Sequence, residues 1–310
     1  FTSSLLLQKS MIKFFPISLM VCASFCFACA SVLIKAVGAN FFGEGVHALQ
    51  IAHARFFFSA IILCFIWYFV RPEVKPTRLK LHFLRSLCGW VGVAIFFTAI
   101  LFIPVSDATA LTFLNPIFAM FFAFIIFKEQ IGGIRWTAAL ISFAGGLFLI
   151  RPTVNFQVDP IALLCLFGAI VMGLEIICIK ALSSKDSIFT ILLVNNLLAT
   201  CIGTIVLPFF FNVPSWSEIF ALISVGLLML LGQFCFINAI KRADTGFLMP
   251  FFYTTLIFVI LIDFFIFYSV PDRISFAGAL IIIFGAVIVA VKEPSIKPHV
   301  VRQSKTHPLI

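Results

Sequence analysis

Two ionisable side chains lie inside long apolar stretches of this chain, where a charge costs about 2.5–3.5 kcal/mol on the insertion scale. Arg55 precedes the aromatic run "FFF" and is suited to pairing with an anionic group. Glu175, in "VMGLEIICIK", is suited to carrying a proton or to facing a cationic group. Arg55 is therefore a candidate binding residue and Glu175 a candidate coupling residue. The structural alternatives are a snorkelling arginine and a carboxyl group bonded to a neighbouring helix.

An Asn-Pro pair interrupts the apolar run "TFLNPIFAMFFAFIIFKEQ" at residues 112–130. Pro116 has no N–H and crowds the carbonyl of Thr112, which kinks a helix and costs about 3 kcal/mol. In lipid, such a kink requires a neighbour, a water or a ligand to bond the freed carbonyl. Asn115 supplies a donor and an acceptor beside it. The pair predicts a helix that is broken where it faces a cavity; a kink that only helps packing is the alternative.

Five more side chains with polar atoms fall at membrane depth, on four predicted helices: Trp90, Asn195, Asn196, Gln233 and Tyr253. Each could instead be a hydrogen-bonding contact between helices, worth under about 1 kcal/mol. Their spread over so many helices favours a common lining. The predicted substrate-binding set is Arg55, Trp90, Asn115, Pro116, Asn196, Gln233 and Tyr253.

The sequence lacks the motifs of metalloproteases, serine hydrolases and P-loop nucleotide hydrolases. Cys22, Cys26 and Cys29 share one helix face, but no fourth ligand accompanies them. All nine cysteines lie in apolar stretches, which is typical of packing residues rather than of a disulfide framework. We therefore expect no metal, no cofactor and no enzymatic activity. A membrane-embedded enzyme or a scaffold is the alternative from another class.

The elements that must position these residues are membrane-spanning helices. Of 310 residues, 63% are hydrophobic and 11% charged, and the mean hydropathy is +1.20. A spanning helix needs about 20 apolar residues, and the chain offers roughly ten such stretches. We expect an all-α integral membrane protein, with an N-terminal tail at 1–13 (Met11 being a candidate start) and a C-terminal tail at 292–310. The ten helices are predicted at 14–37, 47–70, 81–102, 105–128, 132–150, 159–182, 187–211, 217–240, 243–268 and 273–291.

The 21 Lys and Arg residues divide unequally between the two sides of the predicted bundle. With the N-terminus inside, four of them lie on the outer side: Lys35, Arg55, Arg151 and Arg273. The other 17, Arg85 among them, fall in inner loops and tails. Positively charged loops stay in the cytoplasm. Both termini are therefore predicted to be cytoplasmic. The net charge of +9 reflects this bias, so nucleic acid is not an expected partner.

The second half of the chain repeats the first. A shift of 140 residues lays 92–145 over 232–285, with identities such as Gly92/Gly232 and Ala99/Ala239. The repeats are predicted as residues 14–150 and 159–291, with five helices each. An odd number of crossings inserts the second copy upside down. Inverted repeats of this kind recur in secondary transporters, which bind substrate near the midplane between the halves.

Several segments carry a family resemblance. They are "AHARFFFSAIIL", "SDATALTFLNPIFAMFFAFIIFKEQ" and "WTAALISFAGGLFLIRP" in the first repeat and "AIKRADTGFLMPFFYT" in the second. Through them the chain resembles the EamA-like members of the drug/metabolite transporter superfamily. The resemblance implies a ten-helix carrier built from two EamA repeats, which exports or exchanges amino acids, metabolites or drugs. The chain departs from the pattern at Ser269, where the first repeat has Glu129, and at Pro250, which lies earlier than Pro116 does in its repeat.

The leading hypothesis is a secondary transporter, a permease that moves a small metabolite or amino-acid-like solute across the bacterial inner membrane by alternating access. "RFFFS" and "HFLRSL" are also similar to S-adenosylmethionine carriers of intracellular bacteria. This similarity gives an S-adenosylmethionine or nucleotide-type uptake or exchange carrier as the alternative. The expected partners are a small-molecule substrate and the lipid bilayer, and a homodimer is left open.

Overall fold

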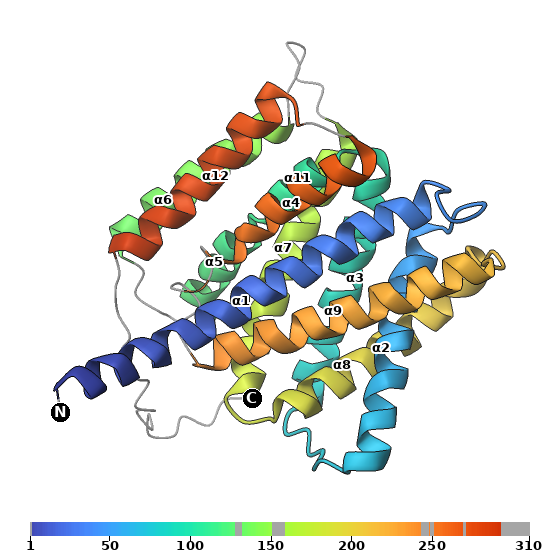
Figure 1. Ribbon diagram of the computed structural model, residues 1–310, viewed down its shortest axis with the longest axis horizontal. Coiled ribbons are helices and arrows are strands. Elements are labelled where there is room, and N and C mark those ends of the chain that lie inside the picture. The colour runs from blue at the N-terminus through green and yellow to red at the C-terminus, as the bar shows by residue number, and fades with distance from the viewer. Residues whose placement is uncertain are drawn as a thin grey trace.

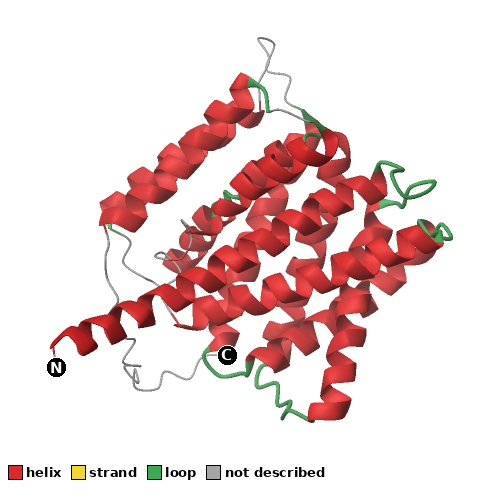
Figure 2. Ribbon diagram, in the orientation of Figure 1, coloured by secondary structure: helices red, strands yellow, loops and turns green. Residues whose placement is uncertain are grey.

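A computed structural model describes residues 2–127, 132–150, 159–242, 248, 251–268 and 271–292. Within these ranges every regular element is a helix, and no strand occurs (Figures 1 and 2). The helices are α1 (Thr2–Gly38), α2 (Ala48–Val70), α3 (Leu79–Phe102), α4 (Val105–Thr112), α5 (Asn115–Phe127), α6 (Gly133–Ile150), α7 (Pro160–Ser183), α8 (Ile188–Val206), the short 3-10 helix η1 (Leu207–Phe209), α9 (Trp216–Arg242), α11 (Thr254–Phe267) and α12 (Arg273–Lys292).

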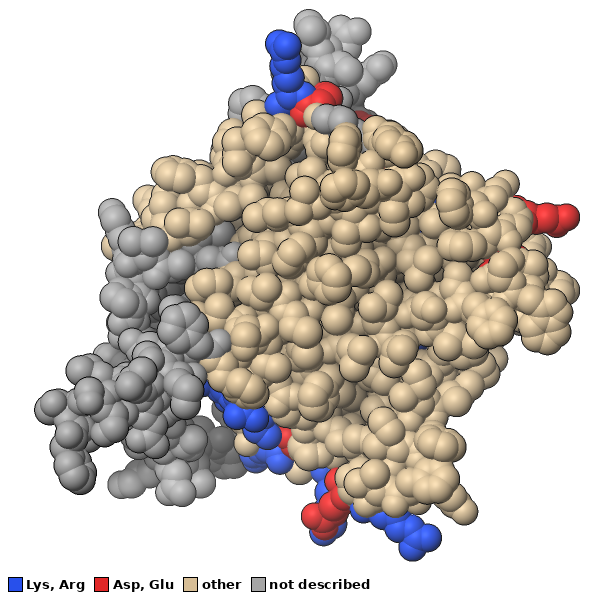
Figure 3. All heavy atoms as spheres, viewed as in Figure 1, with Lys and Arg blue, Asp and Glu red and all other residues tan. Residues whose placement is uncertain are grey.

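Long apolar helices dominate because lipid offers no hydrogen-bond partners, so each segment must satisfy its own backbone. Among the described residues, seven helical segments are long and apolar enough to cross a membrane. Large apolar side chains lie on the outside; Phe65, for example, is 65% exposed. In Figure 3 the face toward the viewer is uncharged over most of its area, and the Lys, Arg, Asp and Glu side chains lie at its margins. This is the surface expected of a protein surrounded by lipid, and the all-α prediction is confirmed.

Three helices differ clearly from their predicted bounds. The first begins at Thr2 rather than at residue 14, because the preceding segment "SSLLLQKSMIK" consists mostly of good helix formers. The predicted helix 105–128 is divided into α4 and α5 by a turn at Phe113 and Leu114. The predicted helix 243–268 lies partly outside the described residues, and α11 begins after a turn at Tyr253.

The helices of the two halves pack on one another in matching pairs. α1 packs on α9 and α11, and its counterpart α7 packs on α3 and α5. α2 packs on its counterpart α8, and α6 lies along α12 at one edge of the bundle (Figure 1). A Cβ added at Gly145 of α6 would lie 2.8 Å from the carbonyl oxygen of Gly278, so this pair needs glycine for its close approach. Most contacts are therefore made between the halves rather than within them.

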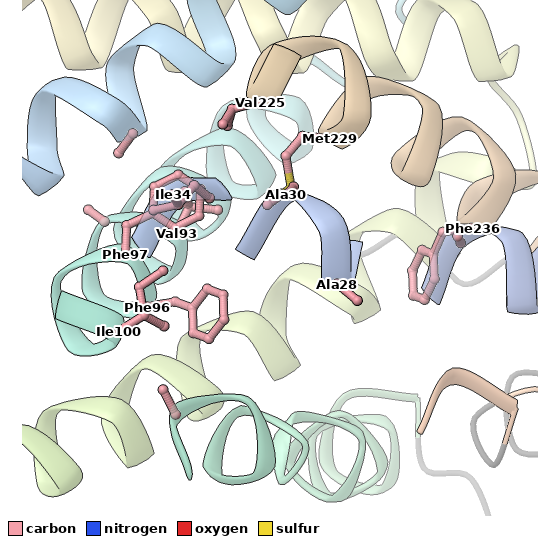
Figure 4. Packing of buried hydrophobic residues seen from close by; sticks show 14 of the residues in the cluster. Ala28, Ala30, Ile34, Val93, Phe96, Phe97, Ile100, Val225, Met229 and Phe236 are labelled. Carbon is pink, nitrogen blue, oxygen red and sulfur yellow. The ribbon is translucent and has the colours of Figure 1, made fainter. Parts of the chain in front are cut away.

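The apolar core lies where α1, α3 and α9 meet (Figure 4). Ile34, Phe97 and Val225 are fully buried there. Small residues on α1, Ala28 and Ala30, let the neighbouring helices approach closely. This packed layer borders the polar centre of the molecule.

Candidate functional site

Two helices break near the centre of the structure and touch at their breaks. The turn at Phe113 separates α4 from α5, and the turn at Tyr253 precedes α11. The hydroxyl of Tyr253 donates a hydrogen bond of 3.1 Å to the backbone carbonyl of Phe113. The two rings pack edge to face, with centroids 4.9 Å apart. The shift of 140 residues that aligns the two halves pairs these same two residues.

The Asn-Pro pair explains the first break. Pro116 has no N–H, and the N–H of Ile117 donates to the carbonyl of Leu114, 3.0 Å away, instead of to that of Phe113 as in a regular helix. The carbonyl of Phe113 is therefore free to accept the bond from Tyr253. The helix is broken at the position that the sequence predicts. The side chain of Pro116 lies outside the described residues.

A cavity of about 130 Å³ lies beside the two breaks, walled by helices of both halves. Its volume is below the range of about 300–1,000 Å³ that is typical of pockets for drug-sized ligands, so it holds a small solute or one end of a larger one. Its polar lining consists of Ser31, Arg55, Arg85, Thr109, Thr112, Asn115, Glu175, Gln233 and Thr255. Its aromatic lining consists of Phe27, Phe96, Phe97, Phe113, Phe236 and Phe252.

Arg85 and Glu175 face each other across the α3–α7 contact. Nη2 of Arg85 lies 3.9 Å from Oε1 of Glu175, and Nη1 of Arg85 donates to the carbonyl of Ile191 at 3.4 Å. Gly89, one turn after Arg85 on α3, makes room for the carboxylate, because a Cβ there would lie 2.9 Å from Oε1 of Glu175. The helix contact thus places one acid beside one of the two buried arginines.

Several buried polar atoms of the lining have no hydrogen-bond partner among the described residues. They are Nε and Nη1 of Arg55, Nε and Nη2 of Arg85, Oγ1 of Thr109 and Oδ1 of Asn115. The guanidinium carbon of Arg55 lies 4.2 Å from the centroid of the Phe56 ring, yet only 3% of the residue is exposed. Buried polar groups in native proteins are nearly always bonded. Six such atoms around one cavity point to a polar ligand.

Four of the predicted site residues line the cavity: Arg55, Asn115, Glu175 and Gln233. Trp90 and Asn196 do not. The indole of Trp90 faces Gly203 on α8, and Nδ2 of Asn196 donates to the carbonyl of Leu192 on its own helix, 2.8 Å away.

The structure places Tyr253 beside the cavity rather than in its lining, with its hydroxyl group used at the helix break.

Sequence reasoning missed Arg85, which was assigned to an inner loop. α3 begins at Leu79, so Arg85 lies nearly two turns inside the helix, and its side chain is fully buried. The predicted helix already began at residue 81, and this alone could have placed Arg85 within the bundle. Ser31, Thr109 and Thr255 were also missed, since a hydroxyl group gives little signal in an apolar run.

Comparisons with known proteins agree with this architecture. The S-adenosylmethionine uptake transporter of Rickettsia prowazekii is 27% identical over 262 residues, covering 84% of this chain and 88% of that protein. The riboflavin transporter of Vibrio cholerae is 25% identical, covering 71% and 74% of the two chains. The pseudopaline exporter of Pseudomonas aeruginosa is 24% identical, covering 87% and 93%.

A protein solved by crystallography shares the fold, with a TM-score of 0.61 and 16% identity over 87% of this chain and 96% of that one. The pattern of the EamA-like transporter family matches residues 14–151 and again residues 159–291. The two matches together span most of the sequence. The chain therefore belongs to the EamA-like transporter family and is a multi-pass permease for small solutes, as expected for the bacterial inner membrane.

Proposed function

We propose that the protein is a secondary transporter that moves a small metabolite or amino-acid-like solute by alternating access, with the central cavity as its substrate site. The observation that carries this proposal is the set of six polar atoms without a hydrogen-bond partner among the described residues, on four residues that line a cavity between the two halves. Transporters with inverted repeats bind their substrates at broken helices near the midplane. Here both breaks lie at the cavity, because Asn115 and Thr255, in the first turns of α5 and α11, line it.

Ten membrane spans in two inverted five-helix halves, 14–150 and 159–291, are part of this proposal. The matching helix pairs and the two breaks 140 residues apart support an internal twofold relation. We also propose that both termini are cytoplasmic. Arg85 lies in the cavity lining rather than in an inner loop, but the remaining Lys and Arg residues keep the same bias.

S-adenosylmethionine is the second candidate substrate. Two uptake transporters named for it, from two Rickettsia species, are each 27% identical to this chain and cover 84% and 79% of it. S-adenosylmethionine carries an amino-acid end, so the same site would serve both candidates. A scaffold would give the polar atoms of the cavity no role, and the names of the family and of the relatives indicate transporters rather than enzymes.

Uptake into lipid vesicles that contain the purified protein tests the proposal. We expect saturable entry of labelled methionine or S-adenosylmethionine, reduced at least about 10-fold by Arg55→Gln, since this change removes a buried charged hydrogen-bond donor. Arg273→Gln is the matched control, because Arg273 is exposed at the start of α12, and it should transport like the wild type. The proposal fails if no solute in a panel of amino acids, S-adenosylmethionine and nucleotides enters faster than into protein-free vesicles.

Glu175 is the proposed coupling residue. It is the only acid among the described residues that line the cavity, and its protonation would remove the carboxylate beside Arg85. Glu175→Gln should therefore keep solute counterflow between equal pools and lose accumulation driven by a pH difference. Normal accumulation by this variant would contradict the coupling role.

A further inference from the structure

We propose that the cavity recognises its solute by a carboxylate group that binds Arg55 and Arg85, with an adjacent N–H or O–H donor that bonds Oδ1 of Asn115. This inference rests on the proposed function, because it names the chemical class of solute for the same cavity. It assigns to Arg85, which no sequence motif indicates, the role of a specificity-determining residue.

The charges of the lining favour a single negative charge on this part of the solute. Arg55 and Arg85 bring two positive charges, and Glu175 is the only acid among the described lining residues. The Glu175 carboxylate lies beside Arg85 and also interacts electrostatically with Arg55, so it balances one of the two positive charges and leaves the other uncompensated. An uncompensated charge inside a membrane protein is costly. A carboxylate balances it with one negative charge, whereas a phosphate monoester, with about −1.5 to −2, would overcompensate.

The shape of the donors fits a carboxylate too. Arg55 and Arg85 each hold two N–H-bearing nitrogens without a hydrogen-bond partner among the described residues. A guanidinium presents such donors in a planar fork that matches two carboxylate oxygens. Both side chains are almost fully buried, at 3% and 0% exposure. α5 and α11 begin at the cavity, so their positive N-terminal ends also favour an anion there.

The second contact follows from the amide of Asn115. Its Oδ1 atom is buried without a partner and accepts hydrogen bonds only, so the solute must supply an N–H or an O–H. Thr109, on the other half of the broken helix, brings a second partnerless oxygen. The small volume of the cavity admits a carboxylate and one neighbouring polar group, and the six phenyl rings leave an apolar surround for the remainder.

Calorimetric binding of four methionine-like probes to the detergent-purified protein tests the assignment. We expect methionine and its 2-hydroxy analogue to bind, since both carry a carboxylate and a donor. Methionine amide, which lacks the carboxylate, should bind at least about 10-fold more weakly, and 4-methylthiobutanoate, which lacks the donor, several-fold more weakly. Equal binding of methionine and its amide, binding of neither methionine nor its hydroxy analogue, or displacement of methionine by equimolar inorganic phosphate would overturn the proposal.

Variants connect the preference to the residues. Arg55→Gln should reduce the ratio of the affinity for methionine to the affinity for methionine amide at least about 10-fold, and Arg273→Gln should leave this affinity ratio unchanged. Arg85→Gln alone leaves Glu175 without its ion-pair partner and can prevent folding. The double variant Arg85→Gln/Glu175→Gln keeps the shape and the charge balance, and it should also lose the preference for methionine over methionine amide. An unchanged ratio in that folded double variant excludes Arg85 as a specificity-determining residue.

Binding and transport measured together distinguish a failure of the carboxylate site from a failure of the proposed transport function. Transport into vesicles of a solute without a carboxylate, unaffected by methionine, would keep the permease and overturn the carboxylate site. Binding of methionine without transport of any solute would keep the site and overturn the permease.

Discussion

At the scale of single residues, the position of the Glu175 carboxylate depends on Gly89, which has no side chain to occupy the same space. A Cβ at Gly89 would lie 2.9 Å from Oε1 of Glu175 and 3.1 Å from its carboxyl carbon. We expect Gly89→Ala to displace the carboxylate from Arg85 and to lower transport about 10-fold or more, with less effect on folding because the alanine is otherwise favourable in a helix.

The matched control is Gly133→Ala, since a Cβ at Gly133 in the first turn of α6 meets nothing within 4 Å. Transport rates and thermal unfolding of both variants give the answer. If both variants transport equally well, the space beside Gly89 has no functional role.

The sequence indicates some residues of the site and not others, for a physical reason. A polar residue within an apolar stretch is conspicuous in the sequence, and four such residues line the cavity: Arg55, Asn115, Glu175 and Gln233. Arg85 lies near the start of a helix, where a positive residue is ordinarily a loop residue by the positive-inside rule. The packing of α3 on α7 places Arg85 beside Glu175 at the cavity, which its position in the helix alone does not predict.

At the scale of elements, the hydrogen bond between the two broken helices stabilises both. Tyr253→Phe keeps the ring contact with Phe113 but leaves the carbonyl of Phe113 buried without its partner. We expect a loss of about 1–3 kcal/mol in the free energy of unfolding, seen as a lower melting temperature in detergent. Tyr268→Phe, at a residue that is 82% exposed, should have no effect. Equal melting of the two variants would show that the bond contributes nothing.

The loop between α7 and α8 forms a second link between the halves, with the α2–α3 loop and the first turn of α3. Asp186, between α7 and α8, accepts hydrogen bonds from Oγ1 of Thr77 at 2.7 Å and from Nε2 of His82 at 2.7 Å. Burial alone would raise the pKa of the Asp186 carboxyl group, but the bonds from Thr77 and His82 outweigh it and hold this pKa below its usual value. The link therefore persists in mildly acidic solution.

The pH dependence of stability follows from this lowered pKa. A carboxyl group whose pKa is lower in the folded protein stabilises it above the unfolded pKa, and the contribution is lost as the pH falls through the folded pKa. Melting temperatures measured from about pH 7 to about pH 3 should fall less for Asp186→Asn than for the wild type. Glu73→Gln, on the exposed part of the same α2–α3 loop, should melt like the wild type at each pH. Parallel curves for all three proteins would contradict the role of Asp186.

At the scale of the whole molecule, patterning predicts the helices and the repeat but not how the halves fit together. Hydropathy locates apolar stretches because lipid imposes a minimum length. The contacts of α1 with α9 and of α7 with α3 join segments far apart in sequence, and no local signal encodes them. The meeting of Phe113 with Tyr253 is such a contact: the repeat makes the residues equivalent, but only the assembled fold brings them together.

We propose that one cavity serves as the solute site and opens to each side of the membrane in turn. Ser31, which lines the cavity, donates to the carbonyl of Phe27 on its own helix and has no other hydrogen-bond partner among the described residues, so Ser31→Cys is a mild change. It would be made in a chain whose nine native cysteines are replaced. Glu73→Cys, on a loop, is the control that should react from one side only.

The measurement is the rate at which a membrane-impermeant thiol reagent labels Ser31→Cys from each side of oriented vesicles. The account predicts labelling from both sides and slower labelling when methionine or S-adenosylmethionine is present. Labelling from one side only, or at rates that neither solute changes while uptake is intact, would contradict it.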